Sequence, residues 1–498
     1  MEHFLSSLPL LSDPQVMLYM VIGVLAGFVI GVLPGLTDPM ALALCIPLTF
    51  YMQPLPAILF LMGIHMACLY GGSITAIMLN TPGKPAAAAT AIDGYPLTKK
   101  GQSRKALQMS AVSCLVGSTI SVLALIIFAP LLGRVALEFG PSEYFAVGIF
   151  GISVVAVVAG KSLPKAFAAA ALGILISTIG ADPLFGIPRF TFGNLNLLSG
   201  IDIVPALTGL FAVSEIFIQI SRKSHGTKKL DLHLEGEGLT LGEFRKSLKT
   251  MIKSGIIGVL VGSHPGTGGV LSSFLSYNEA VRSSKNPEKY GKGELDGIAA
   301  AECGAAGTDS ASLIPLLTFG VPGDMSSAIL LGAFILHGIR VGPDVFTNFG
   351  NVIYAMFIGI IILEILVFVL GWYGSTFIAK IVHIPRHFLF AVITVLVVTG
   401  SFSLNNSFYD VWITLVFGLL GLIMRHRDYP LPALLMGLVL GPIIEKNFSL
   451  AMSSTGGNPI QFLIRPITLI ILALAVIMMY LSVKVQRQMR KATINQLG

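Results

Sequence analysis

Charged residues are scarce in this chain. Lys, Arg, Asp and Glu make up 11% of it, whereas a soluble globular domain carries about 25%. Lys and Arg are absent before Lys84, so we expect no cleavable signal peptide, which needs a basic n-region. The four cysteines form no close pair and have apolar or small neighbours, which favours packing over a disulfide framework or a Cys-type metal site. They are Cys45, Cys68, Cys114 and Cys303.

The chain contains long runs of apolar residues. Hydrophobic residues make up 54% of the chain, and its mean hydropathy is +0.83. The runs 106–132, 351–373 and 460–483 hold no more than one charge each, and a spanning helix needs about 20 such residues. The sequence therefore predicts an all-α polytopic membrane protein with roughly 11–13 membrane segments, half-spans included.

Basic clusters predict the orientation of this chain, because Lys and Arg concentrate in cytoplasmic loops. Four clusters occur, at 99–105, 222–249, 425–427 and 484–491, and we place all four in the cytoplasm. An even number of apolar segments separates the first cluster from the second, and the third from the fourth. The N-terminus is then outside and the C-terminus inside. The net charge of +7 indicates membrane orientation and contact with anionic lipid, not nucleic-acid binding.

Two stretches interrupt apolar helices with Pro-Gly: "GVLPGLTD" at 31–38 and "GSHPGTGG" at 262–269. Lipid cannot satisfy the backbone groups that such a break exposes, so a break inside a span usually serves a ligand. A second pair follows in the same order, "GSITAIMLNTPGK" at 72–84 and "SLIPLLTFGVPGD" at 312–324. This order indicates an internal repeat. The alternative is that each Pro-Gly only kinks a helix or turns a loop.

The basic clusters give the two repeats opposite directions through the membrane. Inverted repeats with broken helices are typical of secondary transporters that bind substrate near the midplane. The predicted organisation is a first repeat core at 1–105, four scaffold spans at 106–221, a cytoplasmic loop at 222–250, a second, inverted repeat core at 251–345 and C-terminal scaffold spans at 346–498.

A helix that restarts after Pro-Gly presents unpaired N–H groups and a positive dipole end, which together bind anions. No Arg lies in the motifs, so an anion depends on helix N-termini, hydroxyl groups and Lys84. The predicted substrate-binding residues are Pro34, Gly35, Leu36, Thr37, Asn80, Thr81, Pro82, Gly83, Lys84, Pro265, Gly266, Thr267, Gly268, Pro322 and Gly323.

Polar residues near the breaks are candidates for ion coupling. The predicted set is Asp38, Thr308, Asp309, Ser310 and His264, with no metal beyond Na⁺ and no resident cofactor. Asp38 is alternatively an N-cap for the segment that starts at Pro39, and Asp309 a packing or capping residue. His264 is preferred to His65 as a proton carrier because it lies in a break. Glu364 lies mid-span outside both repeats, where we expect a structural partner.

Three stretches, at 31–50, 70–101 and 315–343, resemble the large membrane permease subunit of tripartite tricarboxylate transporters, the TctA family. The resemblance implies a non-enzymatic secondary transporter in a bacterial inner membrane, with a periplasmic N-terminus and a cytoplasmic C-terminus. It also implies a di- or tricarboxylate substrate, a small TctB-like membrane subunit and a TctC-like periplasmic binding protein. Symport with Na⁺, or alternatively H⁺, would follow.

Lys84 and Asp324 stand where this family usually has a small or hydroxyl residue, and Asp38 stands where a small residue is more usual. Lys84 and Asp324 are equivalent positions of the repeat and carry opposite charges. We therefore predict an ion pair between them near the pseudo-two-fold axis; the alternative is two independent interfacial charges.

Two other classes of function stay open at this point. A carboxylate channel would give flux that does not depend on an ion gradient. An integral-membrane enzyme is less favoured, because the chain has no phosphate-loop, His-Glu-x-x-His or Gly-x-Ser-x-Gly motif.

Overall fold

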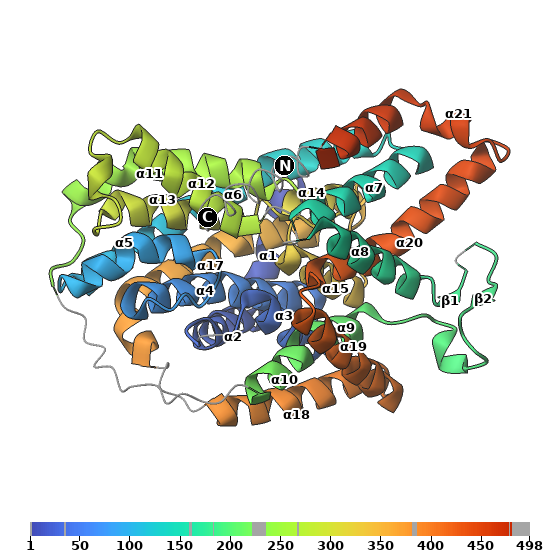
Figure 1. The fold of residues 1–498 in the computed structure, drawn as a ribbon, viewed down its shortest axis with the longest axis horizontal. Coiled ribbons are helices and arrows are strands. Elements are labelled where there is room, and N and C mark those ends of the chain that lie inside the picture. Colours follow the sequence, from blue (N-terminus) through green and yellow to red (C-terminus); the bar gives the residue numbers. More distant parts are fainter. Residues whose placement is uncertain are drawn as a thin grey trace, which may run out of the picture.

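The computed structural model describes residues 2–33, 36–158, 162–182, 184–221, 236–265, 268–380, 386–477 and 479–480. Within these ranges the chain is almost entirely helical (Figure 1), which confirms the predicted all-α class. A short antiparallel hairpin joins β1 (Gly180–Ala181) to β2 (Pro188–Arg189), with Gly180 opposite Arg189. The four cysteines are free thiols, and three of them are buried.

Seven segments of the described chain are long and apolar enough to cross a membrane. This confirms a polytopic membrane protein, and shorter apolar helices lie between these segments. The seven are α2 (Pro14–Gly31), α4 (Pro54–Leu79), α6 (Ser103–Ala136), Ile203–Ile220, Gly350–Ser375 within α17 (Gly350–Lys380), α19 (Phe408–His426) and α20 (Leu431–Ser454).

Other helices complete the fold. The span Ile203–Ile220 combines α9 (Ile203–Leu207), a π-helical turn η3 (Thr208–Val213) and most of α10 (Ser214–Ser221). The rest are α1 (Glu2–Leu11), α3 (Asp38–Cys45), η1 (Ile46–Thr49), α5 (Ala87–Lys99), α7 (Pro141–Val158), α8 (Leu163–Ser177), η2 (Leu195–Leu197), α11 (Leu241–Gly262), α12 (Gly268–Ser283), η4 (Pro287–Lys289), α13 (Leu295–Ala306), α14 (Leu313–Phe319), α15 (Met325–Leu336), α16 (Val345–Asn348), α18 (Arg386–Asn405) and α21 (Pro459–Leu463).

The second Pro-Gly break has the same backbone geometry in both halves. Helix α4 ends where Asn80 adopts a left-handed conformation with φ of 52°, and α14 ends at Gly320 with φ of 72°. The next residue in each half, Thr81 or Val321, donates its N–H to a carbonyl six residues earlier, at 3.3 Å in both cases. A left-handed residue closes the helix, and the proline that follows cannot continue it.

Close backbone packing also matches between the halves. A Cβ added to Gly83 would lie 2.9 Å from the carbonyl oxygen of Gly31, and one added to Gly323 would lie 3.0 Å from that of Gly262. Both positions therefore need glycine, because the chain of the first break approaches each turn. Helix α2 packs on α4 as α11 packs on α13. These contacts support the predicted repeat; its inversion and the predicted domain boundaries stay predictions.

Buried polar contacts tie the first half to the second. The carboxylate of Asp93 on α5 accepts the hydroxyl of Tyr277 on α12 at 2.8 Å and the N–H of Gly293 at 2.8 Å. Thr90 on α5 donates its hydroxyl to Glu302 on α13. Asp93, Thr90 and Glu302 are fully buried, so these bonds hold α5, which follows the second Pro-Gly break, against α12 and α13.

Candidate functional site

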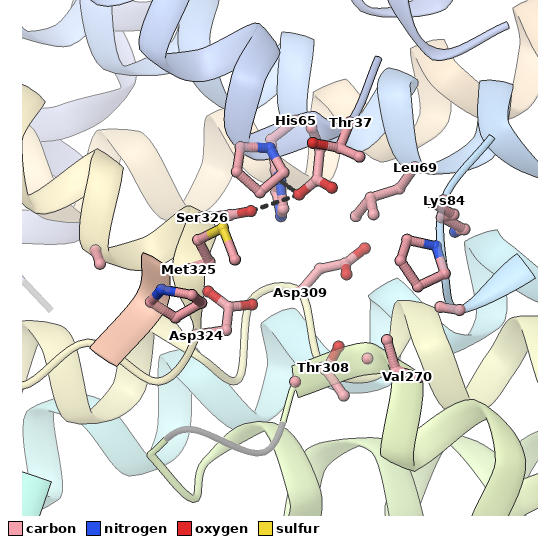
Figure 2. A pocket seen from close by; sticks show the side chains of 18 of the residues that line it. Thr37, His65, Leu69, Lys84, Val270, Thr308, Asp309, Asp324, Met325 and Ser326 are labelled. Atoms are coloured by element: carbon pink, nitrogen blue, oxygen red, sulfur yellow. Dashed lines mark hydrogen bonds and ion pairs between the residues drawn. The ribbon is translucent and has the colours of Figure 1, made fainter. Parts of the chain in front are cut away.

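A cavity of about 380 Å³ lies where the broken helices of the two halves meet (Figure 2). Its size is in the usual range for a small-molecule site. The first half contributes the start of α3, part of α4 and residues 84–86. The second half contributes the starts of α12 and α15 and the break between α13 and α14, and α20 covers one side.

Seven of the residues predicted for substrate binding, ion coupling or the ion pair line this cavity. They come from both Pro-Gly motifs of each half, or from residues next to them, so the structure brings the motifs together as the repeat argument expected. The seven are Thr37, Asp38, Lys84, Gly268, Thr308, Asp309 and Asp324.

Other predicted residues lie outside the lining, mostly because their backbones shape the turns. Asn80 and Thr81 are exposed at the end of α4, and the Thr81 hydroxyl donates to Leu79 O at 3.2 Å. His264 packs edge-on against Phe150, with ring centroids 5.9 Å apart. Leu36, Pro82, Gly83, Pro265, Ser310, Pro322 and Gly323 are described but do not line the cavity. Pro34, Gly35, Gly266 and Thr267 lie outside the described residues.

His65 and Ser326 lie at the centre of the site, although the sequence favoured His264 over His65 and did not single out Ser326. The Oδ2 atom of Asp38 lies 3.2 Å from Nδ1 of His65, a charge contact outside hydrogen-bond geometry, and accepts the hydroxyl of Ser326. Asp38 begins α3, where Thr37 holds the N-cap position. The Asp38 carboxylate thus links α4 of the first half to α15 of the second. It does not cap the N–H groups of its own helix.

Lys84 and Asp309 are buried residues whose side chains line the cavity. Their exposed fractions are 6% and 7%, and both line the cavity from opposite halves (Figure 2). Among the described residues, no ion pair within 4.0 Å involves either of them. A buried charge without a partner is costly, so each of these groups is available to a ligand of opposite charge.

The predicted pair of Lys84 and Asp324 is not formed in this conformation. Both residues line the cavity, but their ion pair is absent from the contacts of the described residues. Asp324 is held elsewhere, because its Oδ1 accepts the N–H of Ser327 at 2.7 Å in the capping box of α15. The pairing stays a prediction, and the two residues here are separate charges that line one cavity from different halves of the chain.

The cavity is acidic overall and has helix N-termini at its edge. Asp38, Asp309 and Asp324 face Lys84 and His65. The carboxylates of Asp38 and Asp324 lie at the first turns of α3 and α15, whereas α12 begins at two glycines that bring backbone to the cavity wall. Such a cavity can hold an anion at Lys84 and the start of α12, and a cation among the carboxylates.

The fold and this cavity define a polytopic membrane protein with a cavity of charged lining between broken helices, and sites between broken helices are typical of transporters. Residues 17–436 match the model of the "Tripartite tricarboxylate transporter TctA family". The chain belongs to this family, which confirms the resemblance of its motifs.

Two relatives come from Agrobacterium vitis. One, described as "Uncharacterized 52.8 kDa protein in TAR-I ttuC' 3'region", is 38% identical over 462 residues, which cover 91% of this chain and 90% of that protein. The other, "Uncharacterized protein in TAR-II ttuC' 3'region", is 36% identical over 230 residues, which cover 45% of this chain and 93% of that protein. No solved structure matches the chain.

Proposed function

We propose that this protein is the large permease subunit of an ion-coupled importer of di- and tricarboxylate anions in a bacterial inner membrane. A TctC-like periplasmic protein delivers the anion, and a TctB-like small subunit completes the membrane complex. The N-terminus is periplasmic and the C-terminus cytoplasmic. The observation that carries the proposal is the buried ammonium of Lys84, which lines a cavity between the two halves and has no ion-pair partner among the described residues.

The anion binds between Lys84 and the first turn of α12. The ammonium supplies a full positive charge, and the N–H groups that begin α12 supply a partial one. Gly268 and Gly269 allow close approach to this backbone, because neither has a side chain to cover it. The hydroxyl of Thr308 is engaged by the carbonyl of Ala305 at 2.7 Å, so Lys84 is the main recognition group.

The acidic lining explains why transport would depend on a cation. A carboxylate that binds about 5 Å from one cavity Asp is repelled by about 3 kcal/mol at an effective dielectric constant of about 20. A monovalent cation between Asp38, Asp309 and Asp324 offsets this repulsion and raises the affinity for the anion. By linkage, the anion raises the affinity for the cation to the same degree. Na⁺ is the expected cation, with H⁺ as the alternative.

Uptake in proteoliposomes tests the proposal. The permease is reconstituted with its small subunit and binding protein, and a panel of labelled di- and tricarboxylates is offered with and without an inward Na⁺ gradient. We expect saturable uptake of at least one carboxylate that needs both the gradient and the binding protein. A stimulation by a pH gradient alone assigns the coupling to protons. Flux that neither saturates nor responds to a gradient supports a channel, and no flux of any carboxylate refutes the proposal.

A further inference from the structure

A second, smaller cavity lies beside the main one. It measures about 20 Å³ and is lined by residues of α4, α6, α13 and α17 together with Lys84 and Asp309; Leu69, Lys84 and Asp309 line both cavities. A cavity of this size holds about one water molecule, so it is too small for a carboxylate substrate. Its polar lining includes Glu364 of α17.

Glu364 lies near the middle of the span Gly350–Ser375 and is 4% exposed. Within the described part of the chain, its Oε1 atom is buried without a hydrogen-bond partner, and its Oε2 atom has only a long contact of 3.4 Å with the hydroxyl of Thr119. No basic group of the described chain lies within ion-pair distance of it. The structural partner expected from the sequence is therefore limited to this weak contact.

The other buried glutamates have strong partners. Glu143 pairs with Arg465 at 3.1 Å, and Glu215 pairs with Arg425. Glu302 accepts hydrogen bonds from Thr90 and, at 3.2 Å, from the thiol of Cys114. An unpaired carboxylate at mid-membrane depth costs several kcal/mol if it is charged. A proton bound to Glu364 would remove this cost.

We propose that Glu364 is a proton-binding site of the transporter, which exchanges its proton with the main cavity through the small cavity and Asp309. Its part in transport rests on the function proposed above, whereas the bound proton itself does not. Protonation moves one proton from a hydronium ion to Oε1, so that one O–H bond forms at Glu364, one breaks in hydronium and a neutral water molecule is left; deprotonation is the reverse. The proton is held when the site is dry and is released when water or the Lys84 ammonium reaches the carboxylate.

The lining favours a proton over a metal ion. Ca²⁺ and Mg²⁺ take about six or more oxygen ligands, whereas the small cavity offers the carboxylates of Glu364 and Asp309 and few other oxygens among apolar side chains. The titratable groups that line it are Tyr70 of α4, Cys114 of α6, Lys84 and Asp309. The Tyr70 hydroxyl donates to Leu107 O at 3.2 Å, so it is already engaged.

Infrared spectroscopy of the purified full-length protein tests the bound proton without any substrate. A protonated carboxylic acid has a carbonyl band that a carboxylate lacks. We expect this band in the wild type at neutral pH and a lower band intensity in Glu364→Gln, which is isosteric with the protonated acid. The matched control is Glu143→Gln, a buried but ion-paired glutamate whose replacement should leave the intensity unchanged. Absence of the band in the wild type, or an undiminished band in Glu364→Gln, overturns the proposal.

Transport of labelled citrate and succinate tests the role of this proton. An inward proton gradient should stimulate uptake by the wild type, and Glu364→Gln should lose that stimulation while it keeps exchange of internal for external anion. Glu364→Asp, which retains an acid, should restore part of it. Proton stimulation that survives in Glu364→Gln, or is absent from a wild type that transports, refutes the role. If the wild type transports no carboxylate, the proposed function fails, and the infrared result still decides whether Glu364 holds a proton.

Discussion

Replacement of Lys84 by Met tests whether its ammonium binds the anion or stabilises the fold. Met keeps an unbranched apolar stem and removes the charge. The stem matters because it packs over Gly72, where an added Cβ would lie 3.1 Å from Cγ of Lys84. The variant therefore removes the charge with little change in packing.

Coulomb's law gives the size of the expected effect on anion binding. A carboxylate 4 Å from the ammonium, at an effective dielectric constant of about 20, is attracted by about 4 kcal/mol. Part of this is offset by desolvation, and hydrogen bonds to charged groups contribute about 1.5–3 kcal/mol net. A loss of about 3 kcal/mol corresponds to roughly a 100-fold loss of affinity for the anion.

The thermal stability of Lys84→Met should not fall together with its affinity for the anion. No carboxylate of the described chain pairs with Lys84, so removing its buried charge should leave the thermal midpoint unchanged or raise it. If Lys84 and Asp324 formed a structural pair, the same variant would lose about 3–5 kcal/mol of stability, and the charge-swapped double variant would regain it.

Uptake kinetics and thermal unfolding of the purified protein distinguish an anion-binding role of Lys84 from a structural one. Lys84→Met should raise KM for the anion about 100-fold with an unchanged thermal midpoint, and Lys84→Arg, which keeps the charge, should lose much less. An unchanged KM in Lys84→Met would refute the anion-binding role. A drop in the midpoint that the charge swap repairs would restore the ion-pair prediction.

Three further predictions follow from the packing and the ion pairs. Gly83→Ala should destabilise the protein, because its Cβ would meet backbone at 2.7 Å, whereas Gly242→Ala, with open space around it, should not; thermal unfolding compares them. Ser326→Ala removes the hydroxyl donor of a cavity carboxylate and should cost about 1.5–3 kcal/mol of stability. Burial raises the pKa of Glu243, at the start of α11, but hydrogen bonds from Lys105 and the N-cap outweigh it and hold the pKa at about 2. Because this pKa is depressed in the folded state, the stabilisation is complete above pH 4.5 and is lost as pH falls toward 2; Glu243→Gln should flatten the pH profile of the melting temperature over that window, and an unaltered profile contradicts the assignment.

The all-α membrane fold and much of the cavity could be predicted because charge is so rare in this chain. Lys84, Asp38 and Asp309 stand out in apolar surroundings, and the Pro-Gly breaks mark the segments whose residues line the cavity. Symmetry correctly brought Lys84 and Asp324 to one cavity. It could not show that the Asp324 carboxylate is committed to its own helix, because both capping and pairing are compatible with the same spacing.

His65 and Ser326 were harder to predict for a different reason. Their contacts with Asp38 depend on how α3, α4 and α15 cross. Ser326 is 288 positions from its acceptor, and its immediate neighbours in sequence carry no sign of that partner. His65 carried the general signal of a polar residue inside a span, but proximity to a Pro-Gly break favoured His264. The lack of a strong partner for Glu364 likewise depends on tertiary packing, because α4 and α6 place no basic group of the described chain beside it.

The bonds from α5 to α12 and α13 bear on how the protein changes conformation. To slide one half past the other, the carboxylates of Asp93 and Glu302 would have to give up their donors inside the protein, at about 1–3 kcal/mol for each group left unsatisfied. The two halves are therefore expected to travel as one rigid body that carries the enclosed ligand. Alternation between the two sides of the membrane would then occur between that body and the remaining spans, and it would have to exchange the hydrogen bonds that join them, such as those from Thr208 to Ala43 O at 3.1 Å and from Tyr70 to Leu107 O at 3.2 Å.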